Sequence, residues 1–134
     1  MDKQIVEREL MTIMRVTEAV AHEMHGARFD AYVSPSSGSR QLCAWQVTVA
    51  PGVDGQQHRV SHEEVFLVLS GAPTLVVDGS ASTLAAGDVA FVPAGGLLRL
   101  ANDGPGDAAL WVTTSVGLHA ELPDGSTVRP PWTR

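Results

Sequence analysis

Two segments of the chain hold glycine, histidine, glutamate and proline at fixed spacings, and these spacings constrain the fold more than any other feature. The first segment, residues 52–71, begins and ends with glycine and holds His58 and Glu64 between them. The second, residues 87–102, begins with glycine, holds Pro93 and ends with asparagine. Glycine permits left-handed backbone and proline fixes one dihedral angle, so residues of this kind mark turns. The two segments therefore predict short strands separated by tight turns.

The chain around these segments has the alternation of half-buried strands. Along residues 41–50 one face holds Cys43, Trp45, Val47 and Val49. Asp78-Gly79 is a strong hairpin signal, and residues 103–106 are expected to form a loop. Short strands with glycine and proline between them are typical of a double-sheet barrel or jelly roll. Further strands are predicted at residues 29–33, 65–69, 73–77, 89–92, 97–101 and 108–114.

The two segments resemble the two signature motifs of the cupin superfamily. In that family the motifs read G-x5-H-x-H-x3-E-x6-G and G-x5-P-x-G-x2-H-x3-N. Val60 and Leu98 stand where the family has two further histidine ligands. The resemblance implies an all-β fold, a double-stranded β-helix or jelly-roll barrel. Eight positions agree with the motifs, namely Gly52, His58, Glu64, Gly71, Gly87, Pro93, Gly95 and Asn102.

The whole chain, residues 1–134, is expected to form a single cupin domain. We divide it into an N-terminal extension (1–25), a barrel core (about 40–117) and a C-terminal arm (118–134). The extension has some helical period over residues 3–25, but Thr12 to Val16 fits a strand equally well. The arm carries Trp132, which needs a hydrophobic pocket. In cupins such arms and N-terminal strands often pack across a dimer, so the resemblance implies a homodimer.

Composition narrows the classes of partner. The formal net charge is −6 and no run of lysine or arginine occurs, which argues against nucleic-acid binding. No apolar stretch approaches the length of a membrane span, and the first ten residues do not resemble a signal peptide. The one cysteine, Cys43, cannot form a disulfide within the chain. These features predict a cytoplasmic protein with no nucleic-acid or membrane partner. The resemblance to cupins implies that it acts on a small organic molecule.

The resemblance also implies which residues form the site. In metal-binding cupins the three histidines and the glutamate of the motifs hold a divalent transition metal. Here only His58 and Glu64 remain, because Val60 and Leu98 cannot coordinate an ion. Two ligands are too few for tight binding unless a third, such as His62, takes part. His62 falls in the turn before Glu64 and is expected to be a solvent-exposed loop residue, so no cofactor is favoured.

Without a metal, His58 and Glu64 point at the same spot and are expected to hydrogen-bond directly. A neighbouring carboxylate raises a histidine pKa, whereas an apolar wall opposes ionisation of both groups. Such a pair suits general acid/base catalysis of the isomerase, cyclase or lyase type. The predicted substrate pocket consists of Trp45, Val60, Leu98 and Leu100. Three alternatives stay open: an inert remnant pair, a non-catalytic binding module, and a metal-dependent dioxygenase that uses His58, Glu64 and His62.

Several other polar and aromatic residues are placed outside the site. Strand alternation turns Arg99 and Gln57 away from the cavity if Leu98 and His58 face it. Cys43 is interpreted as a small buried hydrophobe. Three further histidines are interpreted as surface residues, namely His22, His25 and His119. Four strand aromatics are interpreted first as core residues, namely Trp45, Phe66, Phe91 and Trp111.

Overall fold

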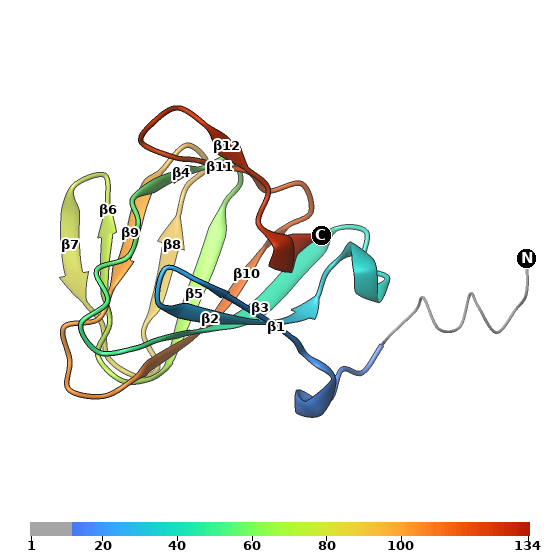
Figure 1. The fold of residues 1–134 in the computed structure, drawn as a ribbon, viewed down its shortest axis with the longest axis horizontal. Helices are drawn as coiled ribbons and strands as arrows, with labels where there is room; N and C mark the ends of the chain where they lie inside the picture. The colour runs from blue at the N-terminus through green and yellow to red at the C-terminus, as the bar shows by residue number, and fades with distance from the viewer. Residues whose placement is uncertain (1–11) are drawn as a thin grey trace, which may run out of the picture.

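The computed structural model describes residues 12–134 and is built from two antiparallel β-sheets that face each other (Figure 1). The predicted all-β jelly-roll class is confirmed. The first sheet has the order β1 (Val20–Met24), β2 (Ala27–Val33), β3 (Leu42–Val49), β10 (Ala108–Ser115), β5 (Glu64–Ser70) and β8 (Val89–Val92). The second has the order β12 (Thr127–Val128), β11 (Ala120–Glu121), β4 (His58–Val60), β9 (Leu97–Ala101), β6 (Thr74–Val77) and β7 (Ser80–Thr83). Short 3₁₀ helices are η1 (Val16–Glu18), η2 (Pro35–Ser37) and η3 (Pro131–Thr133).

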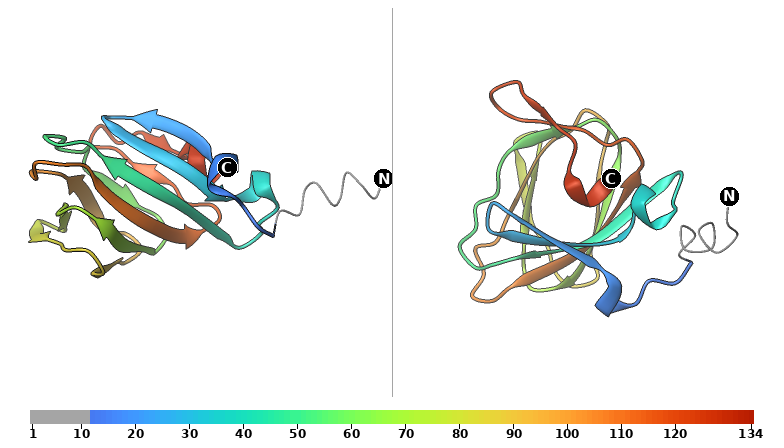
Figure 2. Two further views of the ribbon diagram at one scale, coloured as in Figure 1. Left: turned by 90° about the horizontal axis from the view of Figure 1, so that it is seen from below. Right: turned by 45° about the vertical axis from the view of Figure 1, so that its right-hand side comes forward.

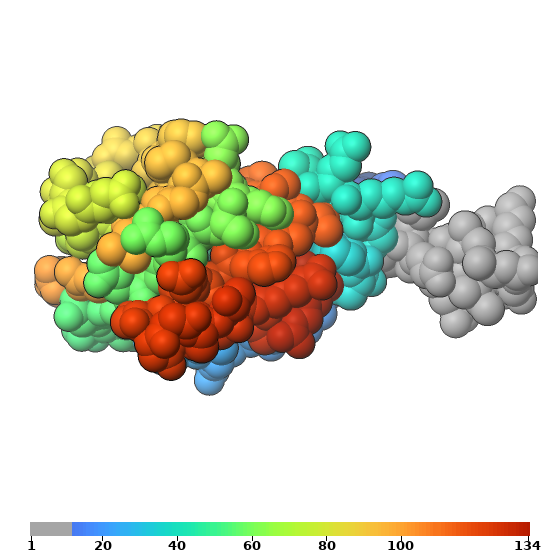
Figure 3. Space-filling view, turned by 90° about the horizontal axis from the view of Figure 1, so that it is seen from above, coloured from blue at the N-terminus to red at the C-terminus, as the bar shows by residue number. Residues whose placement is uncertain are grey.

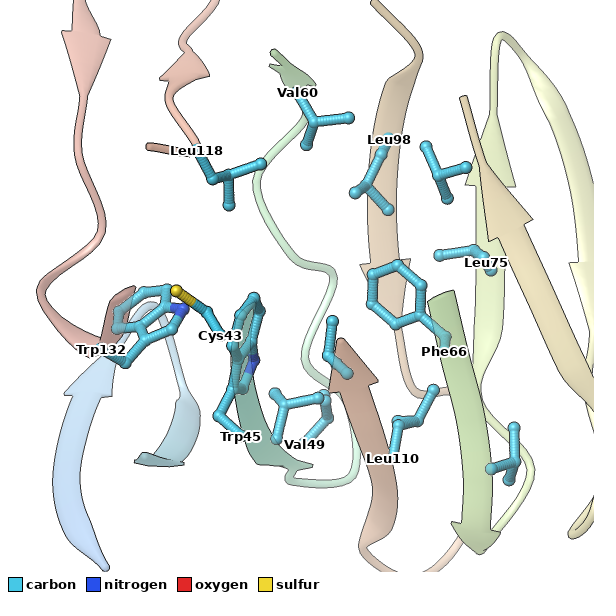
Figure 4. Packing of buried hydrophobic residues seen from close by; sticks show 14 residues of the cluster. Cys43, Trp45, Val49, Val60, Phe66, Leu75, Leu98, Leu110, Leu118 and Trp132 are labelled. Atoms are coloured by element: carbon cyan, nitrogen blue, oxygen red, sulfur yellow. The ribbon is translucent and has the colours of Figure 1, made fainter. Parts of the chain in front are cut away.

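The hydrophobic core lies between the two sheets. The predicted face of β3 points into it, since Cys43, Trp45, Val47 and Val49 are all at most 4% exposed. β3 pairs with β10, whose Leu110 and Val112 are fully buried on the same side. Burial of aliphatic and aromatic side chains on facing sheets is the main term that stabilises such a barrel. Figure 4 shows these residues converging from several strands.

Two residues of the motifs shape turns. Gly71 follows β5 with φ of +80°, and a Cβ atom there would lie 2.7 Å from the Cα of Ala108, so only glycine fits. Asn102 follows β9 and is fully buried. Its amide nitrogen donates to the carbonyls of Val49 (2.9 Å) and Gly106 (2.8 Å), which fixes the predicted loop at residues 103–106. The motif glycine and asparagine therefore hold the sheets in register.

The predicted strands and the predicted hairpin are found in the described residues. The strands predicted at 89–92 and 97–101 are β8 and β9 with the same bounds, and the others agree within two residues at each end. Asp78 and Gly79 have φ of 49° and 82°, and they join β6 to β7 as a two-residue hairpin turn.

The N-terminal prediction was wrong for the residues that the structure describes, while residues 3–11 lie outside them. Residues 12–15 form no strand, and η1 covers residues 16–18. A strand follows instead over residues 20–24 and pairs with β2 along its whole length. This strand forms because β2 offers an edge with which it can pair. The helical period of the sequence alone cannot reveal that edge.

The C-terminal segment folds back onto the barrel of its own chain. β11 pairs with β4, and η3 brings Trp132 against β2 and β3. Figure 2 shows η3 lying across the opening of the ring of strands, and Figure 3 shows the red C-terminal residues covering a continuous part of one face. Trp132 therefore finds its predicted pocket within the same chain and not across a dimer. Among residues 12–134, no helix has the length and apolar character to cross a membrane.

Candidate active site

The space between the sheets contains a cavity of about 260 Å³. All six residues predicted for the site line it, and they come from four strands. β4 and β9 are neighbours, and His58 lies directly opposite Leu98 across this pair. Val60, Leu98 and Glu64 are 1%, 2% and 3% exposed, so the cavity wall is closed to bulk water around them. The six residues are Trp45, His58, Val60, Glu64, Leu98 and Leu100.

His58 is held in one orientation by the backbone. Its Nδ1 atom lies 2.9 Å from the carbonyl oxygen of Gln56. A carbonyl oxygen only accepts hydrogen bonds, so Nδ1 carries the proton and donates it. In the neutral ring Nε2 is then an acceptor and the free base. Burial lowers the pKa of His58 more than the Gln56 contact raises it, which keeps the ring neutral at pH 7.

Glu64 carries a proton on its side chain, whereas the Nε2 atom of His58 does not. Its carboxyl group is buried, and no hydrogen bond from the other described residues reaches it. Burial raises its pKa to about 8, because an apolar surrounding disfavours the charged form. At pH 7 Glu64 is therefore mostly a neutral acid with a proton to donate.

The expected direct contact between the two groups is not found. His58 bonds to Gln56 and not to Glu64, and no charge from Glu64 raises the pKa of His58. Of the two opposing effects expected on the pKa of His58, only the apolar wall acts, because burial is the dominant cause at both residues and a neutral carboxyl group exerts little field. The cavity thus presents a separate base and a separate acid.

The central part of the chain matches a known protein family. Residues 45–115 match the family model described as the cupin domain. The chain belongs to the cupin family.

Solved cupin structures share the fold at low sequence identity. The RmlC-like cupin from Shewanella frigidimarina superposes with a TM-score of 0.68, at 23% identity over 78% of this chain and 90% of that chain. The polyketide cyclase RemF from Streptomyces resistomycificus gives a TM-score of 0.71, at 17% identity over 79% of this chain and 80% of that chain. The salicylate 1,2-dioxygenase from Pseudaminobacter salicylatoxidans gives 0.62, at 22% identity over 71% of this chain and 28% of that chain.

A curated relative is matched over part of its length. The endoribonuclease YbeY of Myxococcus xanthus is 30% identical over 106 residues, which are 78% of this chain. The match spans 36% of that protein, about a third of its length. Its name describes the longer protein as a whole.

The donor atoms of this cupin do not fit a family-type metal site. Val60 and Leu98 provide only hydrocarbon at two of the four ligand positions. His62 does not line the cavity, and its Nδ1 atom lies 3.1 Å from the hydroxyl oxygen of Ser115. Across residues 12–134, no three His, Cys, Asp or Glu side chains lie close enough together to hold an ion.

Restoring the two missing histidines is expected to create a metal site. In a Val60→His, Leu98→His variant all four donors stand at the family positions around the cavity, with His58 directly opposite residue 98. We expect near-stoichiometric Zn²⁺ or Ni²⁺ after dialysis, measured by elemental analysis. The control is the same variant with Glu64→Gln added, which should bind less metal. A folded double variant that takes up no metal would contradict the assignment of Val60 and Leu98 to the family's ligand positions.

Residues outside the motifs complete the cavity of this cupin. Trp132 stacks on Phe29 with 3.7 Å between ring centroids, and both line the wall. Trp132 also lies 6.5 Å from Trp45, and Figure 4 shows the two indoles close together. The sequence did signal that Trp132 needs a pocket, but neither Phe29 nor Trp132 was assigned to this cavity. The indole nitrogen of Trp45 is the one fully buried side-chain donor or acceptor without a partner in residues 12–134.

The mouth of the cavity lies beside the turn between β1 and β2. An outer hollow is lined by His25, Val53, Asp54, Gly55 and Gln56, and all of these except Asp54 also line the inner cavity. His25 is exposed, as predicted, but it was not expected to line the cavity. Its position follows from the hairpin turn, where it has φ of 52°. The position of His25 at the cavity could be predicted only if strand β1, N-terminal to the barrel core, had been predicted as well.

Some of the other residues placed from the sequence lie where they were predicted, and some do not. Arg99, which forms an ion pair with Asp54, and the exposed Gln57 do not line the cavity, and Cys43 is fully buried. Phe66 is buried and lines the cavity, whereas Phe91 is 56% exposed and Trp111 is half-buried against Tyr32. The last two lie on the outer face of the first sheet, so their assignment to the core was wrong. His22 is half-buried, with its ring 6.3 Å from Trp132, and His119 is exposed.

Proposed function

We propose that this cupin is a metal-independent enzyme that moves protons on a small organic molecule, as an isomerase, cyclase or lyase. One observation carries the proposal. The cavity holds a neutral imidazole with a free Nε2 atom and a neutral carboxyl group without a partner, and both line the same cavity. A base and an acid that are kept neutral by burial are ready for general acid/base catalysis at pH 7.

The roles follow from the protonation states. Nε2 of His58 takes a proton from the carbon next to a carbonyl group, and the Glu64 carboxyl group gives its proton to the carbonyl oxygen. This produces an enol, an imidazolium and a carboxylate. In an isomerisation the imidazolium returns its proton to another carbon, and the enol proton returns to Glu64. In an elimination Glu64 instead protonates a hydroxyl group that leaves as water, and the imidazolium then reprotonates Glu64.

The surrounding wall supports these steps. An apolar, closed cavity strengthens hydrogen bonds to a developing charge and excludes water from the reacting atoms. The fold likeness to the polyketide cyclase RemF supports cyclisation as one of the reaction types that this scaffold carries. A non-catalytic binding module is the second candidate, because the wall is almost wholly apolar apart from His58, Glu64 and the polar residues His25 and Gln56.

The test is exchange of protons for deuterium next to a carbonyl group. We expect the wild type to catalyse exchange at the methyl group of 2-acetylnaphthalene in D₂O, measured by NMR. His58→Ala and Glu64→Gln should each lower the rate about a hundredfold. The matched control is His62→Ala, which lies outside the cavity and should keep the wild-type rate. A ligand that binds without any exchange above the rate in buffer would support the binding module.

The pH profile of the exchange rate provides an independent readout. The rate should fall at high pH with a midpoint near 8, where Glu64 loses its proton. It should fall at low pH below the ordinary histidine value, because burial lowers the pKa of His58. A rate limited only by solvent would rise with pH throughout.

We also propose that the protein works as a homodimer in the cytoplasm. The fully buried, unpaired Cys43 is compatible with a reducing compartment. On the outer face of the first sheet, Val65 pairs with Phe91 across β5 and β8, and both are more than 40% exposed. Leu69 and Val89 add to this apolar surface. A single-chain mass in sedimentation equilibrium at micromolar concentration would contradict the dimer.

A further inference from the structure

We infer that the cavity selects uncharged, mostly apolar ring compounds that carry a carbonyl oxygen, and that it rejects carboxylates and phosphates. This substrate class rests on the proposed function for the reacting carbonyl group. The selection against anions rests on the wall alone.

No permanently charged cationic side chain lines the cavity. None of the lining residues is lysine or arginine. The strands that carry the site do contain two arginines, but each follows a cavity residue and therefore points to the other side of the sheet. Arg59 donates to the carbonyl oxygen of Gly95 at 2.6 Å, and Arg99 pairs with Asp54. Neither guanidinium group is available to an anion inside the barrel.

An anion in this cavity would lose its hydration without gaining an opposite charge from lysine or arginine. The wall around His58 and Glu64 is formed by Val60, Leu98 and Leu100, which offer no hydrogen bonds. Moving an unpaired ion into such a site is strongly unfavourable. The neutral state of Glu64, a buried carboxyl group that lines the same cavity, is an internal example of the effect.

The polar groups that do face the ligand favour an oxygen acceptor. Glu64 is 3% exposed, lines the cavity and receives no hydrogen bond from the described residues, so its hydroxyl group can donate to a ligand. The indole nitrogen of Trp45 also lacks a partner but is itself fully buried, so Glu64 is the donor that a ligand can reach. Buried donors that lack partners destabilise the empty protein, and a carbonyl oxygen would satisfy Glu64.

The aromatic part of the wall favours a flat ring. Trp45, Phe66, Phe29 and Trp132 all line the cavity, and the Phe29 and Trp132 rings are parallel within 2°. Aromatic rings of a ligand pack well on such surfaces in edge-to-face or offset arrangements. A bicyclic aromatic ketone combines the required flat body with a single polar acceptor.

The experiment compares two ligands of nearly equal shape, 2-acetylnaphthalene and 2-naphthoate, by equilibrium dialysis at pH 7. We expect the ketone to bind roughly a hundredfold more tightly than the carboxylate. Two matched variants place a cation on neighbouring residues. Gln56→Lys adds a cation at the mouth of the cavity and should reduce the ratio of the two affinities about fivefold. Gln57→Lys adds a cation on the exposed outer side and should leave this ratio unchanged.

Each outcome decides the inference. Equal or tighter binding of 2-naphthoate, no binding of the ketone, or equal effects of the two lysine variants would overturn it. If the ketone is preferred but its methyl protons do not exchange faster than in buffer, the selection stands and the proposed function fails. If exchange is catalysed and both ligands bind equally, the proposed function stands and the selection fails.

Discussion

Replacing Glu64 with glutamine is expected to stabilise the protein at pH 7 by about 3 kcal/mol. The pKa of Glu64 is about 8 in the folded state, against an ordinary value of 4.5. Between these two values the unfolded chain releases a proton that the folded chain keeps. The free energy of unfolding of the wild type therefore falls by up to about 1.4 kcal/mol for each pH unit in this window. Glutamine fills the same space and has no proton to lose.

The pH dependence distinguishes this effect from a simple packing change. Below pH 4.5 both Glu64 states are protonated, so wild type and Glu64→Gln should unfold at nearly the same urea concentration. The gap should open as the pH rises and level off above about 8. Glu63→Gln is the matched control, because Glu63 is the exposed neighbour in the chain. A stability gap that stays constant from pH 4 to pH 9 would contradict the burial of an acidic proton.

This prediction also links stability to catalysis. The same substitution that stabilises the fold is expected to remove the acid and slow proton exchange. Residues whose burial destabilises the protein are expected at functional sites, where the reaction needs them. A more stable and less active Glu64→Gln variant would therefore support an active role for the carboxyl group over the inert-remnant reading.

Replacing Trp132 with alanine is expected to destabilise the protein by about 3–5 kcal/mol. Trp132 is 8% exposed, stacks on Phe29 and lies close to Trp45. The next residue, Thr133, accepts a hydrogen bond from the Cys43 thiol at 3.5 Å. Loss of the indole would remove a large contact surface, enlarge the cavity and loosen the C-terminal segment from β2 and β3.

The matched control is Trp111→Ala, which removes an indole from the outer face of β10. Trp111 is half-buried against Tyr32 and does not line the cavity. We expect a smaller loss of stability in urea unfolding and unchanged affinity for 2-acetylnaphthalene. Trp132→Ala should weaken that affinity as well as the fold. Equal losses in the two variants would mean that Trp132 contributes nothing specific to the cavity.

Much of the central barrel could be predicted from the sequence because its signals are local. Alternation placed Trp45 and Cys43 on the buried face, and Asp78-Gly79 marked a hairpin that the structure contains. The resemblance to the two cupin motifs implied that His58 and Glu64 share a cavity with Val60 and Leu98, and all four line it. The strand and hairpin predictions each depend on residues within one strand or one turn.

The remaining features depend on contacts between distant parts of the chain. Alternation cannot tell which face of a strand is covered, so Phe91 was assigned to the core although it is exposed. The pKa of His58 depends on how completely the wall encloses it, and the enclosing residues include Leu118 and Trp132. Strand β1 forms because β2 offers a free edge, which no pattern within residues 12–24 reveals.

The origin of the cavity wall has a consequence for how such proteins diversify. Ten of the 23 lining residues lie outside residues 45–115, the part matched by the family model. They come from β1, β2 and the C-terminal segment, where Phe29 and Trp132 meet. Mutations in these flanking segments can reshape the space for a ligand without touching the turns that build the barrel. Mutations at the two ends of the domain can therefore change which ligand fits during evolution, while His58 and Glu64 stay in place.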